Sequence, residues 1–363
     1  MKNKRLMAFL KRLVLCGIAF ALIFIIPTIS VNFGDNFELI GKYFVGEKCE
    51  YQGFIEVWNI DTFEAGTKSK TEIIKQAVSV FQNSNRGLFV MVRNLLPNEC
   101  LNLLANGERP DLFSCGYRFA EEIKEYVCEF ENFDLSAVYE NYKNAGKSGE
   151  KQIAVAWCGG AYFFISTADK LNSAKINIED KKLSNVIFDS GFEKKVGKNK
   201  KIIYSVGFGS GDYICPKNCL DAYIKKGQIF SSFAFDEKKK VSTYGAYADF
   251  LSGSSTILLG TQRDMVRIET RLKNNKISNV IFEPVKEYND LVQFFFKTKN
   301  ENKLREKYAQ KFASFMLSAN VQESIYETGL IAVVDGAKRN KNNSVMSNIT
   351  PEIIRGFKLE NVL

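Results

Sequence analysis

The chain has 363 residues, 45% of them hydrophobic, and a formal net charge of +9. Five of its basic residues precede residue 13, so the remainder carries too little positive charge to predict nucleic-acid binding. The chain contains no histidine, which excludes Ser-His and Cys-His nucleophiles and removes the commonest metal ligand. No metal or cofactor is predicted. Enzyme activity is disfavoured but not excluded, because chemistry by paired carboxylates needs no histidine.

A basic cluster followed by an apolar run opens the chain. Residues 2–12 hold five Lys or Arg side chains, and an unbroken apolar run from Leu13 to Ile26 stops at Pro27. This order is typical of an export signal and predicts that residues 1–31 are a signal peptide or a membrane anchor. The rest of the chain is therefore expected outside the cytoplasm, at the cell membrane. Cleavage and retention both stay open, because the run approaches the roughly 20 residues that span a bilayer.

Strands and helices alternate in the first half of the exported part. We expect a strand at 54–58, a polar loop at 59–69 and a helix at 70–82, whose apolar residues recur at helical spacing. A strand at 88–92, a helix at 97–105 and a strand at 111–114 follow. Alternation of this kind predicts a mainly parallel sheet.

The second half continues the pattern after a bend at Gly159-Gly160. Strands at 153–157 and 162–166 flank this bend, where we expect the chain to cross into a second lobe, and residues 167–200 read as irregular loops. The later expected elements are a strand at 202–206, a helix from Asp212 to 225, a helix at 244–251, a strand at 256–259, a helix to 273, strands at 280–282 and 291–296, and helices at 303–318 and around 321–325.

Seven cysteines follow the predicted signal, and this odd number leaves at least one thiol unpaired within a monomer. Cys215 and Cys219 flank three residues and could form a local disulfide or remain two thiols; the spacing does not decide between them. A zinc site is not predicted, because no second pair stands at a matching spacing.

Polar and aromatic residues follow several of the expected strands. Ligands of open α/β sheets lie beyond the carboxyl ends of the strands, so these residues are candidate contacts. Aromatic faces beside carboxylates, amides and guanidinium groups suit a polyhydroxylated neutral ligand and point to a sugar. The candidates are Trp58, Asp61, Phe63, Glu64, Ser114, Tyr117, Arg118, Trp157, Asp212, Tyr213, Gln262, Arg263 and Asp264.

Structural explanations compete with these candidates. A tryptophan at a strand end is more often part of the core than a ligand platform, and Asp61 and Glu64 could belong to a solvated turn. Arg263 and Asp264 could form an ion pair that holds the start of a helix. A glycine-rich turn at 207–211 lacks the lysine and the Ser/Thr of a nucleotide-binding loop.

Four segments, in this order, resemble the extracellular solute-binding proteins of ABC importers. They are Gly53-Phe-Ile-Glu-Val-Trp-Asn-Ile-Asp61, Leu103-Leu-Ala-Asn-Gly-Glu-Arg-Pro-Asp-Leu-Phe113, Ile153-Ala-Val-Ala-Trp157, and Ala246-Tyr-Ala-Asp-Phe250 with Thr261-Gln-Arg-Asp264. The resemblance implies an α/β, two-lobed periplasmic-binding-protein-like fold of the larger, sugar-binding type. It also implies cleft contacts from Asp61, Glu64, Ser114, Arg118, Trp157 and Gln262.

Lobe ranges and a function follow from this resemblance. We expect the first lobe at 50–156 and 261–296 and the second at 157–260 and 297–363, with hinges near Trp157, Gly260 and Phe296. The predicted ligand-binding residues are Asp61, Phe63, Glu64, Ser114, Arg118, Trp157, Asp212, Gln262 and Arg263. The expected protein is a non-enzymatic monomer that binds a small polar solute, with a carbohydrate favoured, and delivers it to a membrane permease.

Two other functions stay open at this point. The family's usual lipid-anchoring cysteine directly after the signal is missing, and Cys49 stands too far along the chain to replace it. A member with a retained N-terminal helix could serve as a membrane-anchored sensor or interaction domain. An exported glycoside hydrolase that uses a carboxylate pair such as Asp61 and Glu64 is the less favoured alternative.

Overall fold

The computed structural model describes residues 49–173, 182–183, 204–206, 213–214, 216–225, 243–338 and 349–362. The predicted signal or anchor at 1–31 lies outside these ranges. Contacts divide the chain into two units, the first made of residues up to Gly53 together with Gln82–Leu88 and the second of the remainder. Within the first unit, the amide of Cys49 donates to the carbonyl of Arg86 at 2.9 Å. None of the helices in the described ranges is both long enough and apolar enough to span a bilayer.

One mixed sheet carries the first expected strands. Its order is β2 (Leu88–Leu95), β1 (Gly53–Ile60), β3 (Leu112–Gly116), β12 (Val292–Thr298) and β4 (Val127–Cys128), and β7 (Ala154–Gly159) also pairs with β12. β1 and β3 are parallel, whereas β12 runs antiparallel to β3, β4 and β7. The prediction of a mainly parallel sheet is therefore wrong. The chain comes to β12 from the second sheet, and the first residues of β12 pair with the last residues of β3. β12 therefore runs in the direction opposite to β3.

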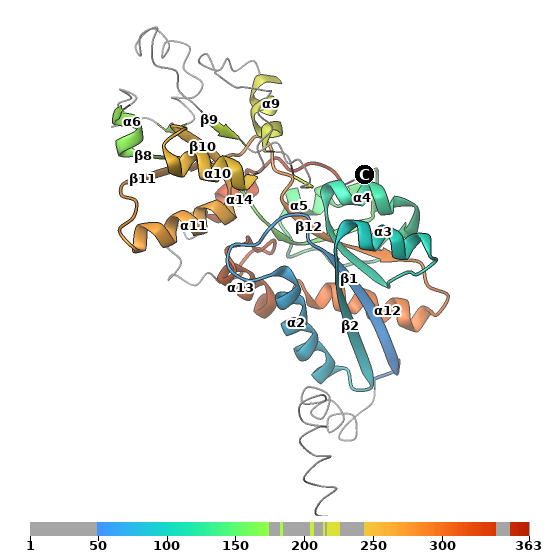
Figure 1. The fold of residues 1–363 in the computed structure, drawn as a ribbon. Helices are drawn as coiled ribbons and strands as arrows, with labels where there is room; N and C mark the ends of the chain where they lie inside the picture. The colour runs from blue at the N-terminus through green and yellow to red at the C-terminus, as the bar shows by residue number, and fades with distance from the viewer. Residues whose placement is uncertain are drawn as a thin grey trace, which may run out of the picture. The chain divides into compact units, whose positions relative to one another are not determined.

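Helices on this sheet follow the apolar spacing that predicted them. α2 (Lys70–Ser84) buries five apolar side chains in the predicted stretch, among them Phe81, whose ring lies 5.2 Å from that of Phe312. Phe312 belongs to α12 (Lys303–Phe315) and also contacts Phe295 of β12, so α12 packs against both the sheet and α2 (Figure 1). The other helices here are α3 (Pro97–Ala105), α4 (Tyr117–Ile123), α5 (Glu140–Ala145), α13 (Ala319–Glu327) and α14 (Pro351–Arg355).

A second sheet has the order β11 (Val280–Pro284), β8 (Tyr162–Thr167), β10 (Ile257–Thr261) and β9 (Tyr204–Val206). β8 is antiparallel to β10 and β11, and β9 is parallel to β10. α10 (Thr243–Ser252) and α11 (Gln262–Lys273) pack beside β10, as Figure 1 shows. α6 (Ala168–Ser173) begins directly after β8, inside a stretch predicted to be irregular, and α9 (Lys217–Lys225) begins later than its predicted start.

Among the described residues, two crossing segments join the sheets, and they run side by side. The first links β7 to β8 through Gly160, and the second leads from β11 to β12 through residues 285–291. The amide of Gly160 donates to the carbonyl of Leu291 at 2.6 Å, and the amide of Val285 donates to the carbonyl of Tyr162 at 2.8 Å. Asn289 Nδ2 adds a bond to the carbonyl of Gly160 at 2.9 Å.

The lobe ranges given above stay a prediction, because sheet pairing alone does not delimit a lobe. Pairing nevertheless differs from those ranges at two places. β11 pairs with β8 in the second sheet, although it was assigned with the first lobe. The chain from β12 onward returns to the first sheet, where Ile331 forms a bridge with Gly159. Both differences arise because the second crossing segment lies between β11 and β12, whereas the predicted ranges place a lobe boundary at Phe296.

Candidate functional site

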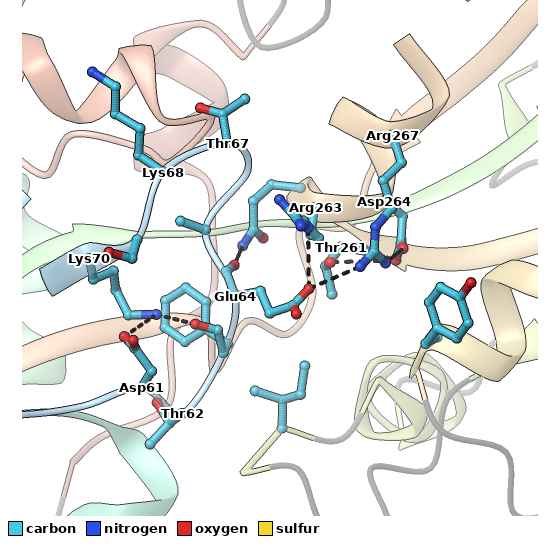
Figure 2. A pocket seen from close by; sticks show the side chains of 16 residues that line it. Asp61, Thr62, Glu64, Thr67, Lys68, Lys70, Thr261, Arg263, Asp264 and Arg267 are labelled. Atoms are coloured by element: carbon cyan, nitrogen blue, oxygen red, sulfur yellow. Dashed lines mark hydrogen bonds and ion pairs between the residues drawn. The ribbon is translucent and has the colours of Figure 1, made fainter. Parts of the chain in front are cut away.

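A cavity of about 550 Å³ lies between the loop after β1 and the start of α11. Both features follow strand ends, because β1 finishes at Ile60 and β10 finishes at Thr261, directly before α11. Figure 2 shows that the labelled side chains come from these two segments. The lining consists of Asp61, Thr62, Phe63, Glu64, Ala65, Thr67, Lys68, Ser69, Lys70, Ile214, Tyr244, Thr261, Gln262, Arg263, Asp264 and Arg267.

A buried lysine shapes the loop after β1. Lys70, the first residue of α2, has a side chain that is 1% exposed, and its ammonium lies 3.3 Å from Asp61 Oδ1. The ammonium also donates to the carbonyl of Phe63 and faces the Phe63 ring at 3.9 Å. A buried ammonium is tolerated only with such partners. Lys70 therefore fixes the turn between Asp61 and Phe63 by binding both residues from the buried side of the loop.

The start of α11 is held by Asp264. The backbone amide of Thr261 donates to Asp264 Oδ2 at 3.0 Å, and Arg267 Nη1 lies 3.2 Å from Oδ1. A carboxylate at a helix N-terminus interacts favourably with the positive end of the helix dipole. Burial raises the pKa of Asp264, while the Thr261 amide and Arg267 act in the opposite direction. Asp264 thus orients Arg267 from the protein side.

Glu64 connects the loop to α11. Its Oε2 lies 3.2 Å from Arg263 Nε and 3.2 Å from Arg267 Nη2, and dashed lines mark both contacts in Figure 2. The Glu64 side chain is 67% exposed, so this carboxylate sits at the mouth of the cavity and not in its floor. The Arg263 guanidinium also donates to the carbonyl of Gly66.

Gln262 joins the same loop to the first crossing segment. Its side chain is fully buried; Nε2 donates to the carbonyl of Glu64 at 2.7 Å, and Oε1 accepts from the amide of Ala161 at 3.2 Å. Both ends of the amide are therefore used in positioning backbone. Through Gln262, the cavity wall is connected to the segment that links the two sheets.

Five of the nine predicted ligand-binding residues line this cavity, namely Asp61, Phe63, Glu64, Gln262 and Arg263. Ser114, Arg118 and Trp157 are not in its lining, and Asp212 lies outside the described residues. Ligand contact by any of the nine stays a prediction.

Ser114 and Trp157 belong to a buried polar network in the first sheet. Trp157 Nε1 and Gln293 Nε2 each donate to Ser114 Oγ at 3.2 Å, and Ser114 Oγ donates to Asn59 Oδ1 at 2.9 Å. These four residues stand on β7, β12, β3 and β1. The register between β7 and β12 shifts at Gln293, and such a bulge re-aims nearby side chains. Both tryptophans of the chain are fully buried.

Arg118 approaches a different carboxylate, at the second crossing segment. Its Nε lies 3.6 Å from Asp290 Oδ2, and the Asp290 side chain is fully buried. Tyr162 and Tyr288 donate to Asp290 at 2.5 and 3.1 Å. Burial raises the pKa of Asp290, and the hydrogen bond from Tyr162 and the charge of Arg118 oppose that rise.

Two charged residues that line the cavity, Lys70 and Arg267, were not predicted as site residues from the sequence. The sequence pattern predicts Lys70 only as the start of a helix and does not distinguish Arg267 from other surface arginines. Arg267 follows Arg263 by four residues, and this spacing puts both guanidinium groups on one face of α11, which was a usable signal. Nothing in the local pattern marked Lys70 as buried. In the described part of the chain, no group of three or more His, Cys, Asp or Glu side chains could hold a metal ion.

Comparison with solved structures places this fold. An ABC substrate-binding protein from Listeria monocytogenes in complex with cycloalternan is 14% identical, with a TM-score of 0.54 over 86% of this chain and 89% of that one. The sugar-binding protein MalE from Xanthomonas citri is 12% identical, with a TM-score of 0.57 over 85% and 87%. A cyclic α-maltosyl-1,6-maltose binding protein from Arthrobacter globiformis is 11% identical, with a TM-score of 0.59 over 86% and 88%.

No family model matches the sequence, and no curated protein matches it. The chain nevertheless has the α/β, two-lobed fold of these sugar-type solute-binding proteins, which confirms the predicted fold class.

Proposed function

We propose that this chain is an extracytoplasmic solute-binding protein that captures a small carbohydrate and delivers it to the permease of an ABC importer. One observation carries the proposal. In a fold shared with proteins described as sugar-binding, the cavity opens between the loop after β1 and the junction of β10 with α11. Such strand-end positions are where open α/β sheets bind ligands.

The residues that line the cavity support binding of a polyhydroxylated solute. Asp61 supplies acceptors, Arg263 and Arg267 supply donors, and Tyr244 supplies an aromatic ring. Ring hydroxyls of a sugar need acceptors and donors together. A cavity of about 550 Å³ falls within the usual range of small-molecule sites.

The crossing segments supply a hinge in this proposal. Gly160 in one segment and residues 285–291 in the other are hydrogen-bonded to each other, so a small rotation of backbone there would move one sheet relative to the other. Closure over the solute would exclude water and strengthen the polar contacts. A permease would then recognise the closed form.

Binding without catalysis fits the ion pairs of the three carboxylates that line the cavity. Asp61 is held by Lys70, and Glu64 is held by Arg263 and Arg267. Asp264 is held by Arg267 and by the amide of Thr261. A glycosidase needs one carboxylic acid that is free to protonate the leaving group. These ion pairs therefore favour a binding site.

A titration decides the proposal. The purified full-length chain is mixed with neutral and acidic mono- and oligosaccharides, amino acids and polyamines, and its thermal unfolding is followed. A ligand at 100 times its dissociation constant adds about 2.7 kcal/mol to the free energy of unfolding. Stabilisation by a sugar class is expected. A flat response to every sugar, or turnover of a glycoside, would refute the proposal. Sugar binding without an uptake defect in a deletion strain would favour a membrane-anchored sensor.

A further inference from the structure

The cations around the cavity differ in how firmly their carboxylate partners are held. Lys70 is held by Asp61, and Arg267 is held by the buried Asp264. Arg263 has its ion pair with Glu64, which Arg267 shares. Lys68, at the rim, lies 3.8 Å from Glu327. If the exposed Glu64 side chain turned into solvent, the cavity would keep two guanidinium groups and only one fixed carboxylate beside them.

The Arg263 guanidinium is incompletely satisfied in the presence of Glu64. Its buried Nε–H makes no hydrogen bond within the described residues, although Glu64 Oε2 stands 3.2 Å away as an ion-pair partner. A buried donor without an acceptor is unfavourable, and a guanidinium prefers a carboxylate that engages it through two parallel bonds. Glu64 therefore occupies this position without making the two parallel hydrogen bonds that the Arg263 guanidinium could donate.

Arg263 and Arg267 would keep their positions without Glu64. Arg263 is tied to the carbonyl of Gly66, and Arg267 is tied to Asp264 and lies 5.4 Å from the rings of Tyr244 and Tyr247. A guanidinium pair fixed in advance binds a planar anion without having to order its own side chains. An exposed ion pair such as that of Glu64 contributes little to stability, so its displacement is easy.

We propose that Arg263 and Arg267 form a carboxylate subsite, that Glu64 fills it when the cavity holds no ligand, and that the solute is an acidic sugar of the uronate class. This inference rests on the proposed carbohydrate-binding function and adds the substrate class. The sugar ring lies in the cavity, and its carboxylate replaces the Glu64 carboxylate between the two guanidinium groups. A neutral sugar offers no group that could make this exchange.

The experiment compares sugars that differ only at one carbon. Galacturonate is titrated against galactose, and glucuronate against glucose, as monosaccharides and as short oligosaccharides, into the full-length chain. The variants are Arg263→Gln, Arg267→Gln and Glu64→Gln. Arg271→Gln is the matched control, because Arg271 stands one turn further along α11 and does not line the cavity.

The expected result is preferential binding of uronates. Arg263→Gln and Arg267→Gln should each weaken uronate binding about tenfold or more, which corresponds to about 1.4 kcal/mol, and weaken binding of the matching neutral sugar much less, because only the uronate loses an ion pair. Glu64→Gln should tighten uronate binding, because it removes the competing carboxylate. In the unmodified chain, uronate affinity should fall as salt rises while neutral-sugar affinity stays constant, and this measurement needs no variant.

Several outcomes would overturn the inference. If neutral sugars bind as tightly as uronates, or if the arginine variants weaken both equally, the subsite is wrong although the proposed function stands. Weaker uronate binding in Glu64→Gln would show that Glu64 is itself a ligand contact. If neither sugar class binds, the proposed function itself fails.

Discussion

Ser114 illustrates how a residue at a strand end can be structural. Its hydroxyl receives hydrogen bonds from Trp157 and Gln293 and gives one to Asn59, all within the first sheet. In Ser114→Ala the indole N–H of Trp157 loses this acceptor in a buried place. We expect a loss of about 1–3 kcal/mol in the free energy of unfolding and an unchanged ligand affinity, measured by urea denaturation and titration.

The exposed Ser136→Ala serves as the control for this substitution. Lower ligand affinity at unchanged stability would instead restore Ser114 as a ligand contact, as the sequence predicted.

Glu306 gives a pH-dependent prediction. Its Oε1 lies 2.7 Å from the ammonium of Lys297, whose side chain is 5% exposed, and Oε2 lies 3.0 Å from that of Lys303. Burial acts to raise the pKa of Glu306, but the hydrogen bonds from the two lysines outweigh it, so the pKa lies below its ordinary value of 4.5. A carboxyl with a lowered folded-state pKa stabilises the protein above 4.5 and loses that contribution as the pH falls through the folded-state pKa.

Glu306→Gln should therefore destabilise the protein by about 2 kcal/mol at neutral pH, because the buried Lys297 loses its counter-charge. The difference from the unmodified chain should shrink as the pH falls below 4.5. Urea denaturation across this range measures the difference, with Glu301→Gln, an exposed residue just before α12, as the control. A deficit that did not change with pH would contradict the ionic explanation.

At the scale of elements, the loop after β1 depends on one close approach. A Cβ on Gly66 would lie 2.5 Å from the carbonyl oxygen of Thr328 and 2.9 Å from the Cα of Gly329, both backbone atoms. The amide of Thr67 donates to that same carbonyl at 2.9 Å. Gly66 thus lets the loop lie against the end of α13.

Gly66→Ala should push this loop away from α13 and move the Gly66 carbonyl that holds Arg263. We expect a loss of about 1–3 kcal/mol in stability, as is usual for overpacking, together with weaker ligand binding. Denaturation and titration measure the two effects. Gly356→Ala is the control, because its nearest neighbours would lie at 3.4 Å. Unchanged binding in Gly66→Ala would mean that the loop position does not matter to the site.

Elements with a clear period were predictable from the sequence, and pairing directions were not. α2 and α12 repeat apolar residues at helical spacing, and both occur within two or three residues of the expected bounds. The direction of β12 depends on where the chain crosses between sheets, which no local pattern encodes. α6 was missed because its short polar sequence has no apolar period.

The candidate site was predictable to the extent that strand ends reveal it. Asp61, Glu64, Gln262 and Arg263 follow β1 and β10 directly and line the cavity. Trp157 could not be assigned in this way, because a bulge between β7 and β12 decides where its ring points. Lys70 could not be found, because only the tertiary structure buries it.

At the scale of the whole molecule, ligand capture should change the dimensions of the protein. Rotation about the crossing segments would bring α11 and the loop after β1 closer around a solute. Small-angle X-ray scattering of the full-length chain should therefore give a smaller radius of gyration with a saturating sugar than without one. A ligand that binds with full affinity and leaves the scattering profile unchanged would argue against hinge closure. A non-binding sugar of equal mass controls for solvent contrast.

The adjacent crossing segments also bear on how such a chain can be rearranged. The chain leaves the first sheet at Gly160 and returns to it at Leu291, and the amide of Gly160 donates to the carbonyl of Leu291. A stretch whose two ends meet in this way can be inserted, exchanged or permuted as a single cassette with little disturbance of its host. A chimaera that joins the segment carrying Arg263 and Arg267 to the first lobe of another protein of this fold should therefore acquire the ligand preference of that segment.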